Sequence, residues 1–294
     1  MNRIFVVGCP RSGTTVVQAL IARHPDVYTL PETDFFEAVH GGTRARWGDA
    51  YAGRGQRWYH RHLGLAQSQG RRVLRTLERR NDVRRRRPSP WGVRGCTRRF
   101  IALLDELAQR ADCGTWVEKT PQHLLYLEEI ARSVPDARFV HVIRSGRDVL
   151  ASIVDADMHQ PGEDFSGGVV TWARRWNRAL ALSLAYREHP RHFLLCLEDL
   201  TRDFDGTWGA LRDFLGLDPG ARLLARPGSR VSSVDHAPWR RREMTGVIAT
   251  PDRKYERLFG PESRQWIEST LSDYAGARRR IGSPAEQLAL STGS

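Results

Sequence analysis

A short apolar run that ends in a glycine-bounded loop is the feature that most restricts how this chain can fold. Residues 4–7 have the pattern of a buried strand, residues 16–21 that of a helix, and the loop between them is Gly8-Cys9-Pro10-Arg11-Ser12-Gly13-Thr14-Thr15. The two glycines have the G-x-x-x-x-G spacing of a nucleotide phosphate loop. The N–H groups of such a loop and of the helix behind it form a cradle for anions. The sequence therefore predicts a phosphate-binding loop at the start of an α/β fold.

Strands and helices continue to alternate along the chain. Further strands are predicted at 27–30, 115–118, 138–143 and 192–197, and helices at 121–131, 147–153, 168–188, 206–215 and 263–274. This order favours a P-loop-like three-layer α/β fold, with a mainly parallel central sheet flanked by helices and ligands at the carboxyl ends of the strands. Residues 40–112 are predicted to be an irregular and helical insertion. We expect residues 1–281 to form a single domain and residues 282–294 a flexible tail.

The net charge of +12 is concentrated in one part of the predicted insertion. Residues 71–99 contain twelve arginines against two acidic residues, which gives +10 in this segment alone. Such a segment is typical either of a surface for an anionic acceptor, a lipid surface or nucleic acid, or of a solvated, partly mobile insertion. Only two lysines, Lys119 and Lys254, stand beside 44 arginines. This bias favours a GC-rich, bacterial coding sequence and makes each lysine worth examining.

The sequence shows no sign of a membrane span or of a metal site. No apolar run approaches the roughly 20 residues that cross a bilayer, and the apolar run after Met1 is too short for a signal peptide. The cysteines have neither paired nor metal-ligand spacing; they are Cys9, Cys96, Cys113 and Cys196. Free thiols in a reducing compartment are therefore expected. We expect a cytoplasmic protein without structural zinc.

The phosphate loop differs from that of most kinases and ATPases. Thr14 stands where a Walker loop has its lysine, and Arg11 supplies the positive charge instead. Kinases of this type usually hold magnesium with an acidic residue at the end of a neighbouring strand, but the strand at 138–143 ends in Arg144. A cation there repels a metal ion and attracts a phosphate. The sequence therefore predicts anion binding without magnesium and disfavours a P-loop kinase, which would hydrolyse ATP with magnesium.

Residues 10–15 resemble the P-[KR]-S-G-T-T loop of sulfotransferases that use 3′-phosphoadenosine-5′-phosphosulfate (PAPS) as donor. A second element of that family, an arginine at a strand end and a serine eight residues later, is matched by Arg144 and Ser152. A weaker match is Leu197-Glu-Asp-Leu200 followed by Phe214-Leu-Gly-Leu217, which is similar to the family's late strand–helix scaffold. Together the three elements span most of the chain.

The resemblance implies how the donor is held. The 5′-phosphosulfate would lie in the loop and the 3′-phosphate at the second element, with 3′-phosphoadenosine-5′-phosphate (PAP) as the product and no metal ion. An arginine supplies a charge-assisted fork for a phosphate, and a serine supplies a hydroxyl. A late serine, Ser233 or its neighbour Ser232, resembles one that touches the donor in related enzymes. The implied donor-binding residues are Arg11, Ser12, Gly13, Thr14, Thr15, Arg144, Ser152 and Ser233.

Two further residues are candidates for the chemistry, beside Arg11. Glu32 follows a predicted strand end and looks like the glutamate base of the tyrosylprotein and several bacterial carbohydrate sulfotransferases; the histidine base of the cytosolic phenol and steroid enzymes has no match here. Lys119 ends the predicted strand at 115–118, and the resemblance implies that it stabilises charge on the sulfuryl or bridging oxygens. The alternatives are that Glu32 is only a helix N-terminal carboxylate and Lys119 only a solvated lysine.

The acceptor is less constrained than the donor. We expect a hydroxyl of a carbohydrate or glycolipid, with a phenolic small molecule or a peptide tyrosine as alternatives. An anionic or membrane-associated acceptor could lie on the arginine-rich segment. The aromatic residues of the insertion either stack on the acceptor or fill a small local core; they are Trp47, Trp58, Tyr59 and Trp91. A nucleic-acid-binding module using residues 71–99 leaves the two donor elements unexplained, so no specific nucleic acid is expected.

Overall fold

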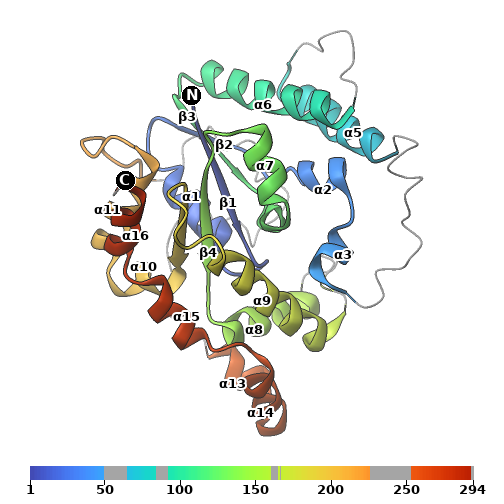
Figure 1. Ribbon diagram of the computed structural model, residues 1–294, viewed down its shortest axis with the longest axis vertical. Coiled ribbons are helices and arrows are strands. Elements are labelled where there is room, and N and C mark those ends of the chain that lie inside the picture. The colour runs from blue at the N-terminus through green and yellow to red at the C-terminus, as the bar shows by residue number, and fades with distance from the viewer. Residues whose placement is uncertain (50–64, 84–91, 160–164, 166, 226–252, 293–294) are drawn as a thin grey trace.

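A five-stranded parallel sheet lies at the centre of the structure, a computed structural model that describes residues 1–49, 65–83, 92–159, 165, 167–225 and 253–292 (Figure 1). The strand order is β2-β3-β1-β4-β5, and every neighbouring pair is parallel. The strands are β1 (Asn2–Gly8), β2 (Val27–Thr29), β3 (Thr115–Lys119), β4 (Arg138–Ile143) and β5 (His192–Cys196). The first strand of the chain is thus the middle strand of the sheet.

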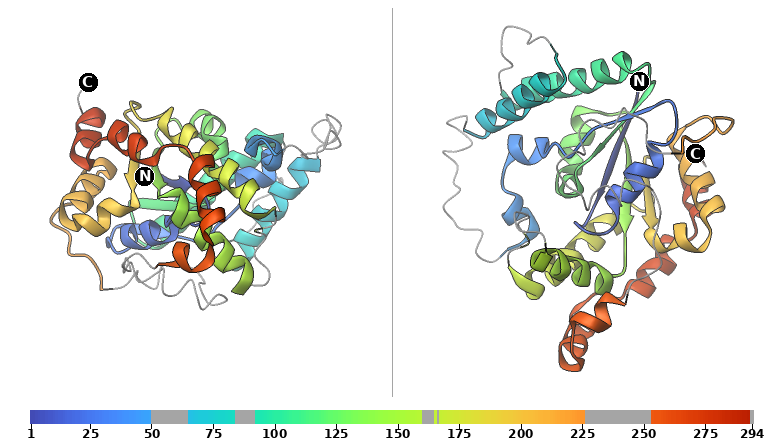
Figure 2. Two further views of the ribbon diagram at one scale, coloured as in Figure 1. Left: turned by 90° about the horizontal axis from the view of Figure 1, so that it is seen from below. Right: turned by 180° about the vertical axis from the view of Figure 1, so that it is seen from behind.

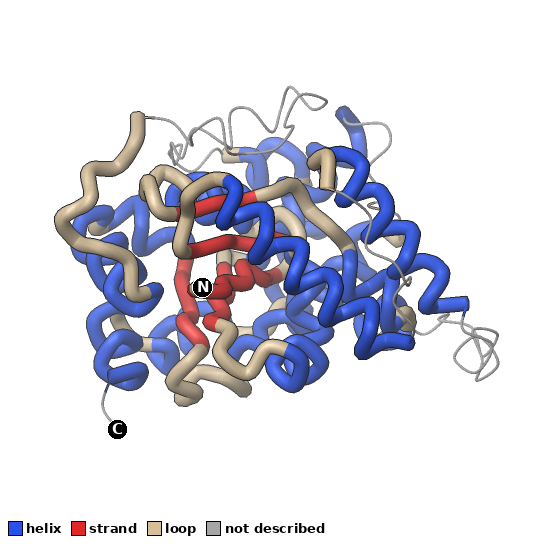
Figure 3. The backbone as a smooth tube through the Cα atoms, turned by 90° about the horizontal axis from the view of Figure 1, so that it is seen from above, coloured by secondary structure: helices blue, strands red, loops and turns tan. Residues whose placement is uncertain are grey.

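Helices cover both faces of the sheet, as the red strands enclosed by blue helices in Figure 3 show. The helices of the first half are α1 (Thr14–Ile21), α2 (Phe35–His40), α3 (Thr43–Trp47), α5 (Leu65–Arg80), α6 (Gly92–Arg110), the 3-10 helix η1 (Pro121–Tyr126) and α7 (Leu127–Ser133). Those of the second half are α8 (Gly146–His159), α9 (Gly168–Leu184), α10 (Leu197–Arg202), α11 (Phe204–Leu215), α13 (Lys254–Leu258), α14 (Pro261–Thr270), α15 (Tyr274–Ile281) and α16 (Pro284–Thr292). The expected three-layer α/β fold is confirmed.

Alternate residues of the strands feed two separate cores because side chains of a strand point to opposite faces. In β1, Phe5 and Val7 belong to the larger core, whereas Ile4 and Val6 belong to the smaller one. The larger core lies under α6, α8 and α9, and the smaller one lies under α1 and α11. A strand that is apolar on both faces can only be a central strand, which is why the sequence pattern of residues 4–7 was informative.

The described part of the predicted insertion is helical. It comprises α3, α5 and α6, and α5 packs against both α2 and α6. In the view from behind, α5 and α6 lie at the opposite end of the molecule from α13 and α14 (Figure 2). Among the described helices, none combines the length and apolar character that a membrane span requires.

The predicted flexible tail at 282–294 is wrong for residues 284–292, which form α16. This helix packs on α11 and along β5, the last strand of the sheet. Gln287 is buried on α16, and its side-chain oxygen accepts a hydrogen bond from the N–H of Leu194 in β5 at 3.4 Å. An edge strand leaves N–H groups unpaired, and the helix satisfies one of them. The helix is therefore fixed by a tertiary contact that its own sequence does not reveal.

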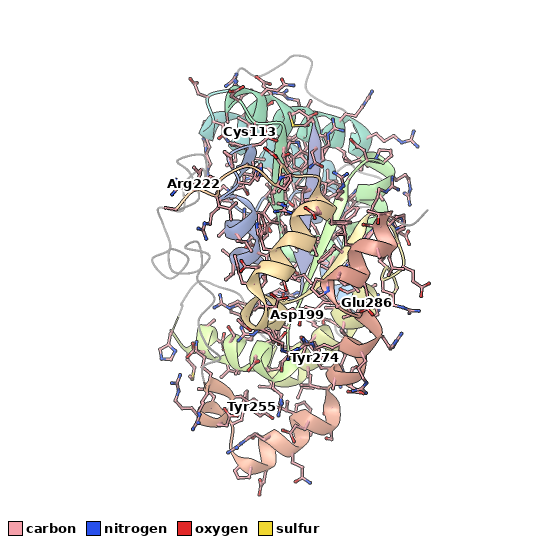
Figure 4. The ribbon with its side chains drawn as sticks, turned by 90° about the vertical axis from the view of Figure 1, so that its left-hand side faces the viewer. Cys113, Asp199, Arg222, Tyr255, Tyr274 and Glu286 are labelled. Carbon is pink, nitrogen blue, oxygen red and sulfur yellow. The ribbon has the colours of Figure 1, made fainter. Side chains whose placement is uncertain are left out.

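The C-terminal helices also close over the end of β5. Tyr274 of α15 donates a hydrogen bond from its hydroxyl to Glu198 of α10, at 2.5 Å, and Arg278 pairs with Asp199. Figure 4 labels Asp199 and Tyr274, which lie close together at this junction. Glu198 also accepts the backbone N–H of Ser145, at 3.0 Å. The helices after β5 are thereby connected to the turn that follows β4.

Candidate functional site

The loop after β1 adopts a conformation that requires glycine at two positions. A Cβ atom at Gly8 would lie 2.5 Å from the carbonyl oxygen of Val142 in β4. Gly13 has φ +96°, and a Cβ atom there would lie 2.7 Å from the side chain of Leu197. Arg11, between them, is held at φ +68°, which is uncommon for a residue with a side chain. A strained backbone of this kind persists only where the surrounding structure holds it in place, which is common in loops that clamp ligands.

The same loop presents backbone donors that helix α1 does not satisfy, and a buried hydroxyl. The N–H of Val17 is the first in α1 to find a helical partner, the carbonyl of Gly13, so the N–H groups at the preceding positions 14–16 have none within the helix. The hydroxyl of Ser12 is buried, and its oxygen has no hydrogen-bond partner among the described residues. A buried polar atom without a partner is costly and needs an explanation. An anion with several oxygen acceptors fits this cradle.

The phosphate loop and the second donor element meet in the structure. Gly8 is the register partner of Val142, so the loop after β1 and Arg144 after β4 begin at neighbouring strand ends. The guanidinium of Arg11 donates a hydrogen bond to the hydroxyl of Ser152 on α8, at 3.2 Å. Residues 141 positions apart thus come into contact. The structure brings the two predicted anion-binding elements to one edge of the sheet.

Arg144 is held mainly through its backbone. Its carbonyl accepts a hydrogen bond from the indole N–H of Trp176 in α9, at 3.0 Å. The side chain is one-quarter exposed, and among the described residues its nearest carboxylate oxygen, on Asp148 in the first turn of α8, is 4.0 Å away. This is a weak ion pair, so the guanidinium can form a stronger one with a ligand.

Glu32, Lys119 and Thr15 form a second cluster at the same edge. Glu32 follows β2, Lys119 ends β3, and Thr15 lies in the first turn of α1. The ammonium of Lys119 contacts the carboxylate of Glu32 and donates a hydrogen bond to the hydroxyl of Thr15, at 3.1 Å. Lys119 is almost fully buried, whereas the Glu32 side chain is one-quarter exposed. The predicted base and the predicted cation are therefore in contact beside the phosphate loop.

A buried carboxylate lies directly behind this cluster. Glu118 is fully buried, and one of its oxygens accepts hydrogen bonds from the hydroxyls of Thr33, at 2.8 Å, and Thr120, at 2.6 Å. Its other oxygen lies 2.9 Å from Nδ1 of His123, which is also fully buried. Burial raises the pKa of Glu118, but its interactions with His123 and with the two hydroxyls outweigh this effect and lower the pKa below its ordinary value. Glu118 is thus an ionised carboxylate that connects the side chains of Thr33, Thr120 and His123.

Further carboxylates follow Glu32 along the chain. Asp34 has φ +49° and precedes α2, and Glu37 lies within that helix. Burial and the neighbouring Asp34 carboxylate raise the pKa of Glu37 to about 7. One Glu37 oxygen accepts a hydrogen bond from Thr43, at 3.3 Å, and the other is buried without a partner in the described part of the chain. Glu37 is therefore an acid that changes its charge near neutral pH.

Several other predicted residues can be placed. Trp47 is buried and donates its indole N–H to Gln122, at 2.9 Å, so it fills a local core and does not present its ring to an acceptor. Trp172 and Trp176, one turn apart on α9, are buried and pack that helix onto the larger core. Outside the described residues lie Trp58, Tyr59, Trp91, Ser232, Ser233 and the arginines at 84–87.

Sequence reasoning missed the residues behind the site. Thr33, Thr120 and His123 flank the two predicted catalytic residues in the chain, yet their common partner, Glu118, was not recognised. The available signal was a glutamate inside an apolar strand, since a buried acid requires hydrogen-bond partners.

The fold and site define a P-loop-like α/β protein whose loop after β1 has Thr14 at the position of the Walker lysine and Arg11 as its cation. The sequence matches the Sulfotransferase family over residues 3–219, about three-quarters of the chain. The chain therefore belongs to the sulfotransferase family. This confirms the resemblance found in the loop and at Arg144.

Individual relatives are more distant. A Caenorhabditis briggsae protein, provisionally named a protein-tyrosine sulfotransferase, is 28% identical over 180 residues, which are 60% of this chain and 51% of that protein. The chain thus spans about half the length of this curated relative. The sulfotransferase domain of the olefin synthase from Synechococcus PCC 7002 superimposes with a TM-score of 0.55 and 20% identity, covering 92% of this chain and 95% of that domain. The second similarity shows a shared fold.

Proposed function

We propose that this protein transfers a sulfuryl group from PAPS to an acceptor hydroxyl, with Glu32 as the general base. The observation that carries the proposal is the contact of Glu32 with Lys119 and of Lys119 with Thr15 of the phosphate loop. These contacts would bring the base Glu32, the cation Lys119 and the phosphate loop together at the carboxyl edge of the sheet. Membership of the sulfotransferase family supports the reaction class.

Two groups of residues would hold the donor. The N–H groups at the start of α1, the orphan hydroxyl of Ser12 and the hydroxyls of Thr14 and Thr15 would bind the 5′-phosphosulfate. The fork of Arg144 and the hydroxyl of Ser152 would bind the 3′-phosphate, and Ser233 is proposed as a further contact on the sequence resemblance alone. Arg11 touches Ser152 in this structure and would neutralise charge between the two phosphate sites.

The reaction needs one proton transfer and one substitution at sulfur. Glu32 would accept the proton of the acceptor hydroxyl while that oxygen forms its bond to sulfur. The bond between sulfur and the bridging oxygen breaks in line with this attack, and the electron pair stays on the 5′-phosphate of PAP. Lys119 and Arg11 would stabilise the charge that develops on the sulfuryl and bridging oxygens. When the donor binds, its oxygens would share the Lys119 ammonium with Glu32, whose carboxylate would stay beside it and accept the proton of the acceptor hydroxyl.

We further propose that the transfer requires no metal ion. Glu118 stands at the end of β3, where a P-loop kinase could use an acid for magnesium, but it is fully buried and already accepts hydrogen bonds on both oxygens. The other neighbour of β1, strand β4, is followed by Arg144. The charge that a metal ion would supply is therefore carried by side chains.

For the acceptor we propose a hydroxyl of a carbohydrate or glycolipid. A peptide tyrosine is the main competitor, because the nematode relative is named for that substrate, and a phenolic small molecule is the other. An anionic or membrane-associated acceptor on the arginines of α5 and α6 remains part of the proposal. A panel of sugars, glycolipids, phenols and tyrosine peptides, each offered with labelled PAPS, would identify the class.

The variant Glu32→Gln tests the proposal directly. We expect PAP binding, measured by calorimetry, to stay within about twofold of wild type, because Glu32 is not among the residues that hold the donor. Transfer should slow by roughly 10²- to 10⁴-fold, the usual contribution of a general base. The control is Glu262→Gln, an exposed glutamate on α14. A Glu32→Gln protein that transfers at the wild-type rate, or a wild-type protein that does not bind PAP, would refute the proposal.

A further inference from the structure

A network of buried polar groups connects the segment that carries Glu32 to the strand that carries Lys119. Thr33 is next to Glu32 in the chain, and Glu118 is next to Lys119. The hydroxyl of Thr33 donates to Glu118 at 2.8 Å, and both side chains are buried. A hydrogen bond with an ionised acceptor is stronger than one between neutral groups, and it is stronger still away from water. The two catalytic candidates are therefore tied together by their neighbours.

Thr120 adds a second connection from the other side. Its hydroxyl donates to Glu118, at 2.6 Å, and its oxygen accepts the backbone N–H groups of Thr33, at 3.1 Å, and Asp34, at 3.4 Å. Asp34 is held at φ +49°, a conformation that costs free energy for a residue with a side chain. The turn that follows Glu32 is thus fixed, against its own backbone preference, by hydrogen bonds to Thr120, the residue after β3.

His123 extends the network to the start of α2. Its Nε2 accepts the backbone N–H of Phe36, at 3.2 Å, so this nitrogen carries a lone pair. The proton of the neutral ring then lies on Nδ1, which donates to Glu118 at 2.9 Å. One imidazole therefore joins the Glu118 carboxylate to the helix that begins after Glu32. All polar atoms that these contacts involve are satisfied.

We propose that Glu118, Thr33, Thr120 and His123 form a positioning network that holds the Glu32 carboxylate against the Lys119 ammonium. In the described part of the chain, the hydrogen bonds of these four side chains run to one another and to the backbone that follows Glu32, so the four residues would act through Glu32 and Lys119. The network would set the distance between the base and the cation, to which a transfer reaction is sensitive: a displacement of 1 Å can slow a reaction by about 100-fold. This inference rests on the proposed roles of Glu32 and Lys119.

The chain offers a direct readout of the Lys119 contact. It contains only two lysines, Lys119 and Lys254, and the second pairs with Asp155 at 2.7 Å. A protein labelled with ¹³C-lysine therefore gives two ε-methylene signals in a carbon–proton correlation spectrum, and Lys254→Arg assigns them. The signal of Lys119 in Glu32→Gln marks the state without the ion pair. The Lys254 signal serves as an internal control for the fold.

The matched variants are Thr33→Val, which keeps the shape but removes the hydroxyl, and Thr33→Ser, which keeps the hydroxyl. We expect Thr33→Val to move the Lys119 signal towards its Glu32→Gln position and to leave the Lys254 signal in place. It should lower kcat at least about tenfold, while PAP affinity and the KM for PAPS stay within about twofold. Thr33→Ser should retain the wild-type Lys119 signal and most of kcat. Glu118→Gln, which conserves volume, should repeat the effect of Thr33→Val.

The outcomes separate this inference from the proposed function. A Thr33→Val protein with the wild-type Lys119 signal and the wild-type kcat would overturn the network. So would a fall in kcat that is equally large in Thr33→Val and Thr33→Ser. If Thr33→Val does not fold, Glu118→Gln decides by the same two measurements. If Glu32→Gln transfers at the wild-type rate, the proposed base is wrong, and the positions of the Lys119 signal still decide whether the network holds the ion pair.

Discussion

Replacement of Arg144 by alanine tests whether the second donor element binds a phosphate. The side chain is one-quarter exposed and its carboxylate partner, Asp148, is 4.0 Å away, so its removal breaks little in the free protein. A hydrogen bond between charged groups contributes about 1.5–3 kcal/mol, and 1.4 kcal/mol corresponds to tenfold in affinity. We therefore expect PAP to bind Arg144→Ala about 10- to 150-fold more weakly, with the melting temperature nearly unchanged.

Isothermal calorimetry with PAP, with and without a metal chelator, measures this effect. Arg147 provides a matched control, because it lies three residues further along the chain in the first turn of α8, is half exposed and pairs with Glu268 at 3.4 Å. Arg147→Ala should bind PAP like the wild type, and the chelator should change neither affinity. The reasoning is refuted if Arg144→Ala binds PAP with the wild-type affinity, or if Arg147→Ala weakens PAP binding as much as Arg144→Ala does.

Two further predictions concern the loop and the carboxylates beside it. Gly13→Ala should destabilise the fold by at least about 1 kcal/mol more than Gly41→Ala, measured by urea unfolding, because both positions have positive φ but only the first would bring its Cβ to 2.7 Å from Leu197. Equal losses would show that the contact with Leu197 does not matter. The pKa of Glu37 is raised to about 7 by burial and by Asp34, so the folded protein binds a proton that the unfolded chain releases above about pH 4.5. This proton stabilises the fold at low pH, and up to roughly 3 kcal/mol should be lost as the pH rises from about 4.5 to 7. Glu37→Gln should remove that loss. Urea unfolding at pH 5 and pH 8 should therefore show that the free energy of unfolding of the variant, relative to that of the wild type, is higher at pH 8 than at pH 5. A difference in free energy that does not change with pH would contradict the assignment.

Those parts of the fold that depend on local patterns could be predicted from the sequence. The five strands were found because each is a short apolar run between polar segments, and in a parallel sheet both faces of such a run are buried. The loop after β1 was found because its two glycines are required by backbone geometry. The two predicted donor elements come together, with Arg11 in contact with Ser152, because parallel strands share their carboxyl edge.

Other parts depend on partners far away in the chain. Glu118 receives the hydroxyl of Thr33 across 85 residues, and no local pattern specifies which hydroxyl will satisfy a buried acid. The segment 284–292 was predicted to be a flexible tail because it is short and partly polar. It forms helix α16 because it packs against the edge strand β5, a contact that its own sequence does not specify. Trp47 is of a residue type that often stacks on ligands. Only its burial and its hydrogen bond to Gln122 show that the ring lies inside a local core.

The central place of β1 has a consequence for how the molecule is made. Asn2 at its start pairs with Thr115 in β3, and Ile4 pairs with Arg138 in β4. During translation β1 therefore leaves the ribosome more than a hundred residues before its neighbours β3 and β4. Contacts so distant in sequence form slowly, and an apolar strand with two open edges is prone to aggregation meanwhile. A nascent chain of this kind is an expected client of chaperones that bind exposed apolar segments.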